Sequence, residues 1–80
     1  MTTIFIMVKC ELGQVYVVAS QAIDRVENVA EVHSISGEYD LLVKCFVPDG
    51  QDIGRFVTEE IQTLPGIRST FTLIAFKAFS

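Results

Sequence analysis

The sequence is poor in the residues that build metal and redox sites. It contains one histidine and two cysteines, Cys10 and Cys45, which form no C-x-x-C motif. No set of His, Cys, Asp and Glu has the spacing of a metal site, and no glycine-rich segment has the lysine of a phosphate loop. We therefore expect neither a metal nor a cofactor. Both cysteines fall in apolar stretches, where buried and reduced thiols are expected.

Positive charge and long apolar runs are also scarce. Six Lys and Arg face ten Asp and Glu, for a net charge of −4, and the basic residues are scattered. Direct DNA binding needs a basic surface, so we expect none. The longest uncharged apolar run is far shorter than the ~18 residues of a membrane span, and no basic leader follows Met1. These features predict a cytoplasmic protein that does not enter a membrane.

What the sequence does have is hydrophobic residues, which make up 50% of its 80 positions. A chain of this length forms one domain, residues 1–80, and buries only a modest share of its surface. The apolar excess therefore predicts a partner subunit that covers part of the domain.

Apolar periodicity divides the chain into six elements. The expected elements are a strand over 3–9, a helix over 15–26, a strand over 29–36, a strand over 41–47, a helix over 53–64 and a strand over 67–77. The first helix has its apolar stripe at Val15, Val18, Ala19, Ala22, Ile23 and Val26. Asp49 or Asp52 is expected to cap the second helix, and Pro65-Gly66 to end it.

The order strand, helix, strand, strand, helix, strand predicts an α+β, ferredoxin-like βαββαβ fold. This fold has a four-stranded antiparallel sheet with two helices on one face. The strands at 3–9 and 41–47 are apolar on both faces, as expected of the two central strands. Because the helices cover one face only, we expect two copies to pack sheet to sheet, as in a dimeric α/β barrel.

A four-residue link, Gly37 to Asp40, joins two predicted strands, and the segment Ser36-Gly37-Glu38-Tyr39-Asp40 has two interpretations. In one, it is turn chemistry alone: Gly37 supplies a positive φ and Asp40 accepts hydrogen bonds from backbone amides. In the other, the same amides hold the carboxylate of a small zwitterion and Asp40 holds its ammonium group. A rigid turn can serve both roles.

Two further sets of polar residues admit a plain and a functional interpretation. Thr70 and Thr72 share one face of the last strand, either as ordinary strand formers or as two hydroxyls for a ligand. His33 is either a hydrogen-bonded strand residue or the general base of a small dimeric-barrel enzyme with an intersubunit pocket. No arrangement of nucleophile, base and orienting acid accompanies it, so we expect no enzyme.

Three segments closely resemble the effector domain of the Lrp/AsnC (feast/famine) transcription regulators, called the RAM domain. These segments are Glu31–Lys44, with a G-x-Y-D turn at 37–40, Val47–Asp49, and Leu64–Thr72, with a P-G-I-x-x-T-x-T run at 65–72. The resemblance covers nearly the whole chain. The family's helix-turn-helix has no counterpart, because Met1 leads directly into the first strand, so we expect a stand-alone RAM domain.

The resemblance implies a non-catalytic module that binds an amino-acid effector between subunits and is linked to regulation of amino-acid metabolism. It implies homodimers that assemble into octamer or decamer rings. Because the helix-turn-helix has no counterpart here, we expect any gene regulation to proceed by co-assembly with a full-length relative. The ligand-binding residues that it implies are Gly37, Tyr39 and Asp40, with Glu38 as a variable position, and Thr70 and Thr72 from the last strand.

Overall fold

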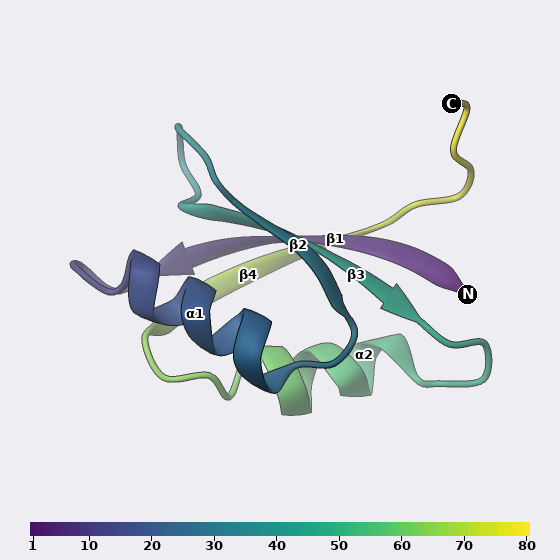
Figure 1. Cartoon of the computed structure of the whole chain (residues 1–80), viewed down its shortest axis with the longest axis horizontal. Coiled ribbons are helices and arrows are strands. Elements are labelled where there is room, and N and C mark those ends of the chain that lie inside the picture. The colour runs from purple at the N-terminus through teal and green to yellow at the C-terminus, as the bar shows by residue number, and fades with distance from the viewer.

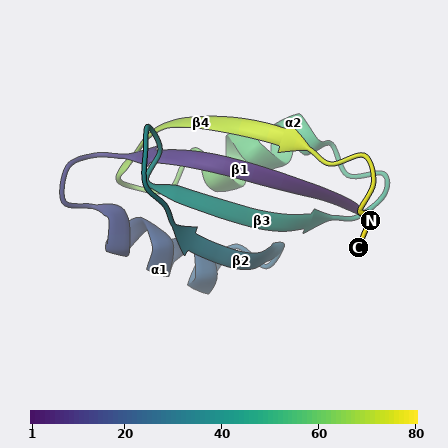
Figure 2. The same ribbon diagram turned by 90° about the horizontal axis from the view of Figure 1, so that it is seen from above.

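The predicted order of elements is present in a computed structural model that describes residues 1–80. The elements are β1 (Thr2–Cys10), α1 (Val15–Arg25), β2 (Val29–Ser34), β3 (Leu41–Val47), α2 (Ile53–Phe56), the π-helical segment η1 (Val57–Ile61) and β4 (Ile67–Ile74). The four strands form one antiparallel sheet in the order β2-β3-β1-β4 (Figure 1, Figure 2). This is the predicted ferredoxin-like arrangement, with β1 and β3 in the centre.

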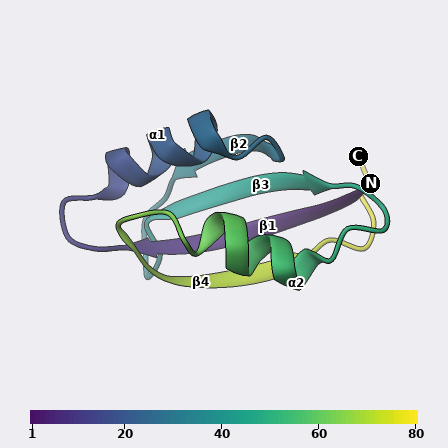
Figure 3. The ribbon, with the colours of Figure 1, turned by 90° about the horizontal axis from the view of Figure 1, so that it is seen from below.

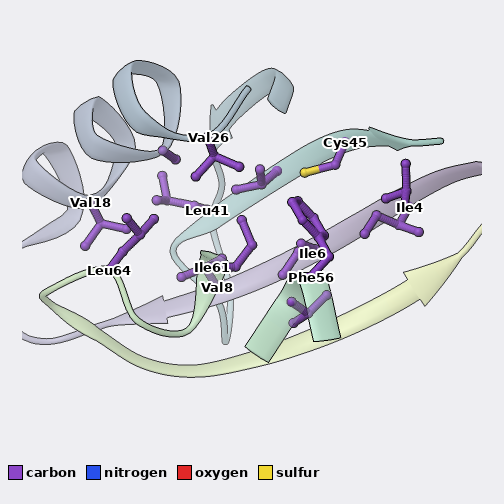
Figure 4. Close-up of a cluster of buried hydrophobic side chains, with 14 of the residues drawn as sticks. Ile4, Ile6, Val8, Val18, Val26, Leu41, Cys45, Phe56, Ile61 and Leu64 are labelled. Carbon is purple, nitrogen blue, oxygen red and sulfur yellow. The ribbon is translucent and has the colours of Figure 1, made fainter. Parts of the chain in front are cut away.

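One face of the sheet carries the hydrophobic core. Alternate residues of β1 and β3 point toward the helices and are almost fully buried, and no polar side chain is buried among them (Figure 4). The sheet residues of this core are Ile4, Ile6, Val8, Cys10, Leu41, Val43, Cys45 and Val47. The core is therefore held by apolar burial, which contributes roughly 25 cal/mol per Å².

Both helical segments cover this same face, side by side (Figure 3). Val18 and Ala22 of α1 are buried, as the apolar stripe predicts. The prediction for Ile23 is wrong, because its side chain is 62% exposed. At about 100° per residue, Ile23 lies roughly 140° around the helix from Val18, beyond the buried stripe.

Asp52, one of the two candidate caps, lies at the start of the second helical segment. The Asp52 carboxylate accepts a hydrogen bond from the Arg55 amide at 3.0 Å, whereas Asp49 lies 3.3 Å from the N-terminal ammonium. The segment continues from α2 into the π-helical turn η1 and ends at Ile61, whereas the sequence predicts one helix over 53–64. Phe56 of α2 and Ile61 of η1 are both buried in the core.

Gly66 lies where the loop before β4 meets the start of α1. Its φ is +96°, and a Cβ on it would stand 3.0 Å from Val18 Cγ2 and 3.1 Å from Gln14 Cβ. The backbone carbonyl of Gly66 also accepts a hydrogen bond from the Glu11 amide at 2.8 Å. Only a residue without a side chain allows this close approach.

Two predicted strand ends are wrong. β2 ends at Ser34 rather than at residue 36, and β4 ends at Ile74 rather than at residue 77. Residues 75–80 leave the sheet on the side opposite the helices (Figure 1). Neither helical segment has the length and apolar character needed to span a membrane.

The two cysteines are free and buried. Cys45 lies opposite Ile4 in the β1–β3 register, six residues along β1 from Cys10. At about 3.3 Å per residue the two are roughly 20 Å apart, too far for a disulfide.

Candidate ligand-binding loop

The sheet face away from the helices, here called the open face, is apolar at its centre. Its apolar side chains alternate with those of the core, and several are about half exposed: Phe46 by 38%, Phe71 by 51% and Leu73 by 45%. The register places Phe5 opposite Leu73, and Met7 between Leu42 and Phe71. An exposed apolar patch on a small protein is typical of an interaction surface.

The loop between β2 and β3 rises on the side of the open face, away from the helices (Figure 1). It comprises residues 35–40, so the prediction of a four-residue link at 37–40 is wrong. The Ile35 amide donates to the Asp40 carbonyl at 3.0 Å and closes the base of the loop. The loop is therefore longer than a two-residue hairpin turn and projects beyond the sheet.

Asp40 fixes the loop to the neighbouring strand β1. Its carboxylate Oδ2 accepts a hydrogen bond from the Cys10 amide at 2.8 Å, and its own amide donates to the Val8 carbonyl at 2.9 Å. Burial, followed by the nearby Asp40 carboxylate, raises the pKa of the Cys10 thiol. The predicted role of Asp40 as an acceptor for backbone amides is confirmed, although its partner lies on another strand.

Phe71 and Lys9, which the sequence analysis does not predict as site residues, also hold the loop. The Tyr39 ring stacks on Phe71 with centroids 6.3 Å apart, and Lys9 Nζ donates to the Glu38 carbonyl at 2.9 Å. Strand alternation alone places Phe71 on the opposite face from Thr70 and Thr72. This alternation indicates that Phe71 contacts the loop only once it is known that the loop folds over the open face.

The tip of the loop presents unused backbone donors. The amides of residues 36–39 donate to no other group of the chain. Gly37 has a φ of +104°, as the turn interpretation predicts, and nothing lies within 4 Å of the position of a Cβ there. The plain interpretation of these amides is solvation by water; equally, successive free amides can form an anion-binding concavity.

Thr70 and Thr72 do share one face of β4, but it is the face toward the helices. The register places them opposite Val8 and Ile6, whose side chains are in the core. Thr70 Oγ1 accepts a hydrogen bond from Gln62 Nε2 at 2.8 Å. Within one chain, the two threonines and the loop therefore lie on opposite sides of the sheet.

His33 belongs to an exposed ion cluster on β2 and β3. Its Nε2 lies 2.9 Å from Glu31 Oε1, and Lys44 Nζ lies 3.3 Å from Glu31 Oε2. The hydrogen bond from His33, followed by that from Lys44, lowers the pKa of Glu31. This arrangement orients the imidazole through the Glu31 carboxylate. No three His, Cys, Asp or Glu side chains are grouped so as to hold a metal ion.

Known proteins resemble this chain in sequence and in fold. An uncharacterised helix-turn-helix-type transcriptional regulator of Pyrococcus horikoshii is 32% identical over 77 residues, which are 94% of this chain and 51% of the regulator. The chain thus spans about half the length of this relative. A homocitrate synthase of Sulfolobus acidocaldarius is 35% identical over 72 residues, which are 90% of this chain and 15% of that enzyme.

A solved structure and a family model cover nearly the whole chain. The crystal structure of a Thermus thermophilus protein superposes with a TM-score of 0.86 at 34% identity, and the match covers 100% of this chain and 99% of that one. Residues 3–80 match the model of the Lrp/AsnC ligand-binding domain. The chain therefore belongs to the Lrp/AsnC family, as a copy of its ligand-binding, or RAM, domain.

Proposed function

We propose that this chain is a non-catalytic module that binds an amino-acid effector and couples its binding to oligomer assembly. The family to which it belongs supports a regulatory, effector-sensing role. The observation that carries the amino-acid proposal is the loop 35–40, which is fixed at Asp40 and Tyr39 while the amides of residues 36–39 remain free. A fixed loop loses little conformational entropy when it binds a ligand.

In the proposed site, the free amides at Gly37 and its neighbours hold the carboxylate of the amino acid. Asp40 uses only Oδ2 to hold the Cys10 amide, so its second oxygen and its charge are available to the ammonium group. Glu38 is exposed at the tip of the loop and tunes the local charge. A hydrogen bond between charged groups is stronger than one between neutral groups, which suits a zwitterion.

The site is completed by more than one copy of the chain. Because Thr70 and Thr72 lie on the helix side of the sheet, hydroxyls that reach the same ligand as the loop must come from another copy. The open face is the surface for the smallest assembly, a face-to-face homodimer, and further contacts build an octamer or decamer ring. This would place the amino acid between subunits.

The dimer is tested by sedimentation of the wild-type chain and of Phe71→Asp. Burying a charge without a partner is costly, so the variant should dissociate to folded monomer. The matched control is Ile23→Asp, an exposed apolar position on the helix side, which should leave the dimer intact. A wild-type chain that is a stable monomer at micromolar concentration would refute the dimer.

The ligand is tested by a thermal-shift screen against the twenty amino acids, because a ligand that binds only the native state raises the apparent stability. Calorimetric titration of the best ligand then compares the wild type with Asp40→Asn. The asparagine can still accept the Cys10 amide but has no charge. A charge-assisted bond contributes about 1.5–3 kcal/mol, so affinity should fall roughly ten- to a hundredfold.

The matched control for this titration is Asp24→Asn, which removes the same charge from an exposed position of α1. It should bind the amino acid as the wild type does. Unchanged affinity in Asp40→Asn, with the oligomer intact, would mean that Asp40 serves the loop alone. The alternative of a barrel enzyme makes a different prediction, since His33→Gln would then abolish turnover while leaving amino-acid binding intact.

The partners follow from the same proposal. Several relatives that share this domain are named as transcriptional regulators and carry about as much sequence again. We infer that the module acts in the cytoplasm by co-assembly with a full-length relative that supplies the DNA-binding part. These 80 residues are not expected to bind DNA themselves, given their net charge of −4.

A further inference from the structure

Two large aromatic side chains stand free of the fold at the end of the chain. Phe76 is 100% exposed and Phe79 is 91% exposed. The last bond that ties this segment to the sheet runs from the Ala75 amide to the Thr3 carbonyl, at 3.0 Å. Beyond it, residues 76–80 make no backbone hydrogen bond. Each exposed ring leaves apolar surface in contact with water, and burial of that surface would be favourable.

The direction of this segment, residues 75–80, links it to the open face. Figure 1 shows it rising on the same side of the sheet as the loop 35–40, at the other end of the strands. Between the segment and the sheet lies a hollow of about 620 Å³, lined on the sheet by Thr3, Phe5, Lys44 and Phe46. Anything that packs on the open face is therefore bordered by the loop at one end and by this segment at the other.

We propose that residues 75–80 form an arm that clasps a second copy of this chain in the face-to-face dimer. This proposal rests on the dimer proposed above and adds the surface that secures it. Packed sheets lie about 10 Å apart, and four extended residues span about 13 Å, so an arm anchored at Ala75 can bring Phe79 to the level of the partner sheet. Phe76, at the base of the arm, lies between the two sheets and closes the end of the interface.

Symmetry doubles the effect of each arm. A two-fold dimer has the same contacts twice, so the arm of each copy packs on the other copy. Four phenylalanine rings then leave water when the dimer forms, in addition to the apolar centre of the open face. The rings of Phe76 and Phe79 are exposed in the isolated subunit, so their replacement should affect assembly while leaving the fold unchanged.

The first test measures the dimer dissociation constant by sedimentation of a Phe76→Ser/Phe79→Ser variant. The loss of two buried rings from each copy should weaken the dimer by at least about a hundredfold. The matched control is Leu12→Ser/Tyr16→Ser, which removes two side chains that are 98% and 82% exposed near α1. The control should dimerise as the wild type does, and both variants should keep the wild-type circular dichroism spectrum.

The second test asks whether the arm contacts its own subunit or the other one. A nitroxide is attached at Ala78→Cys, and Cys10 and Cys45 are only 6% and 0% exposed, so the label is directed to the new thiol. Labelled copies are co-refolded with isotope-labelled wild-type copies. Line broadening in the wild-type copies is expected around Phe46 and the neighbouring open face.

The outcomes separate the arm from the dimer. A dimer whose dissociation constant is unchanged by the loss of Phe76 and Phe79, or equal weakening by the control, would overturn the arm while leaving the dimer standing. The absence of line broadening in the isotope-labelled wild-type copies would overturn it too, because the arm would then fold back on its own sheet. A monomeric wild type would refute both proposals together.

Discussion

Replacing Gly66 by alanine should destabilise the chain more than any other single methyl group added to a glycine with a positive φ. The new Cβ would stand 3.0 Å from Val18 Cγ2 and 3.1 Å from Gln14 Cβ. Val18 is 1% exposed and cannot move away without disturbing the core beneath α1. Left-handed backbone costs a residue with a Cβ about 1–2 kcal/mol, and overpacking costs about 1–3 kcal/mol. We therefore expect a loss of roughly 2–5 kcal/mol, against a total stability of about 4–12 kcal/mol for a domain of this length.

The variant Gly37→Ala separates the cost of the left-handed backbone from the cost of overpacking. Gly37 also has a positive φ, of +104°, but nothing lies within 4 Å of its Cβ position. It should lose only the backbone term, about 1–2 kcal/mol. Urea unfolding at one fixed protein concentration measures both variants, since assembly makes apparent stability depend on concentration.

The contact with Val18 is tested directly by a double-mutant cycle. Val18→Ala removes the methyl group nearest to the new Cβ, so the loss from Gly66→Ala should be smaller by about 1 kcal/mol in the Val18→Ala background. Equal losses in Gly66→Ala and Gly37→Ala, together with no coupling in the cycle, would refute the steric argument. The loop before β4 would then be free to move away from α1.

Three further predictions follow from the ionisable groups. Hydrogen bonds from His33 and then Lys44 lower the pKa of Glu31 in the folded state. The stabilisation that Glu31 gives is therefore present above the ordinary carboxyl pKa of about 4.3 and is lost as the pH falls through the lowered pKa. Urea titrations should show that the unfolding free energy of the wild type falls more between neutral pH and that acid range than the unfolding free energy of Glu31→Gln does. Burial raises the pKa of Cys45 to about 11 and raises that of Cys10, so a chromogenic disulfide reagent at neutral pH should react with both thiols at the rate of unfolding, and a fast native reaction would contradict this. Fluorescence anisotropy at about 0.15 M salt should detect no binding of duplex DNA by these 80 residues, and salt-sensitive binding would disprove the prediction.

The sheet was predictable from the sequence because its central strands carry two apolar faces. Phe5 and Met7 alternate with Ile4 and Ile6, so β1 has no polar side to give to water. That pattern is local and follows from the two-residue repeat of a strand. The prediction that Ile23 is buried was wrong for a general reason. The sequence pattern assigns an apolar residue at the margin of a helix stripe to the core, but the packing of the helix decides whether that residue is buried.

The candidate site was predictable in its residues but not in its geometry. The glycine and aspartate of the loop carry turn chemistry that is visible in the sequence. The partner of Asp40 is Cys10, thirty positions away on β1, and no local pattern indicates that pairing. The stacking of Tyr39 on Phe71 depends on the direction in which the loop leaves the sheet, which is a tertiary property. Thr70 and Thr72 were correctly assigned to one face, yet the sequence does not say which face meets the loop.

The hydrogen bond that fixes Asp40 has a consequence for how this family can vary. Its donor is the main-chain amide of position 10, not a side chain. Every amino acid except proline supplies that donor. Position 10 is therefore free to drift among the residues that fit its buried site, whereas position 40 needs a short side chain with an oxygen acceptor. Among related chains that keep this loop, proline should be absent at position 10, and a chain that has proline there should no longer have aspartate at position 40.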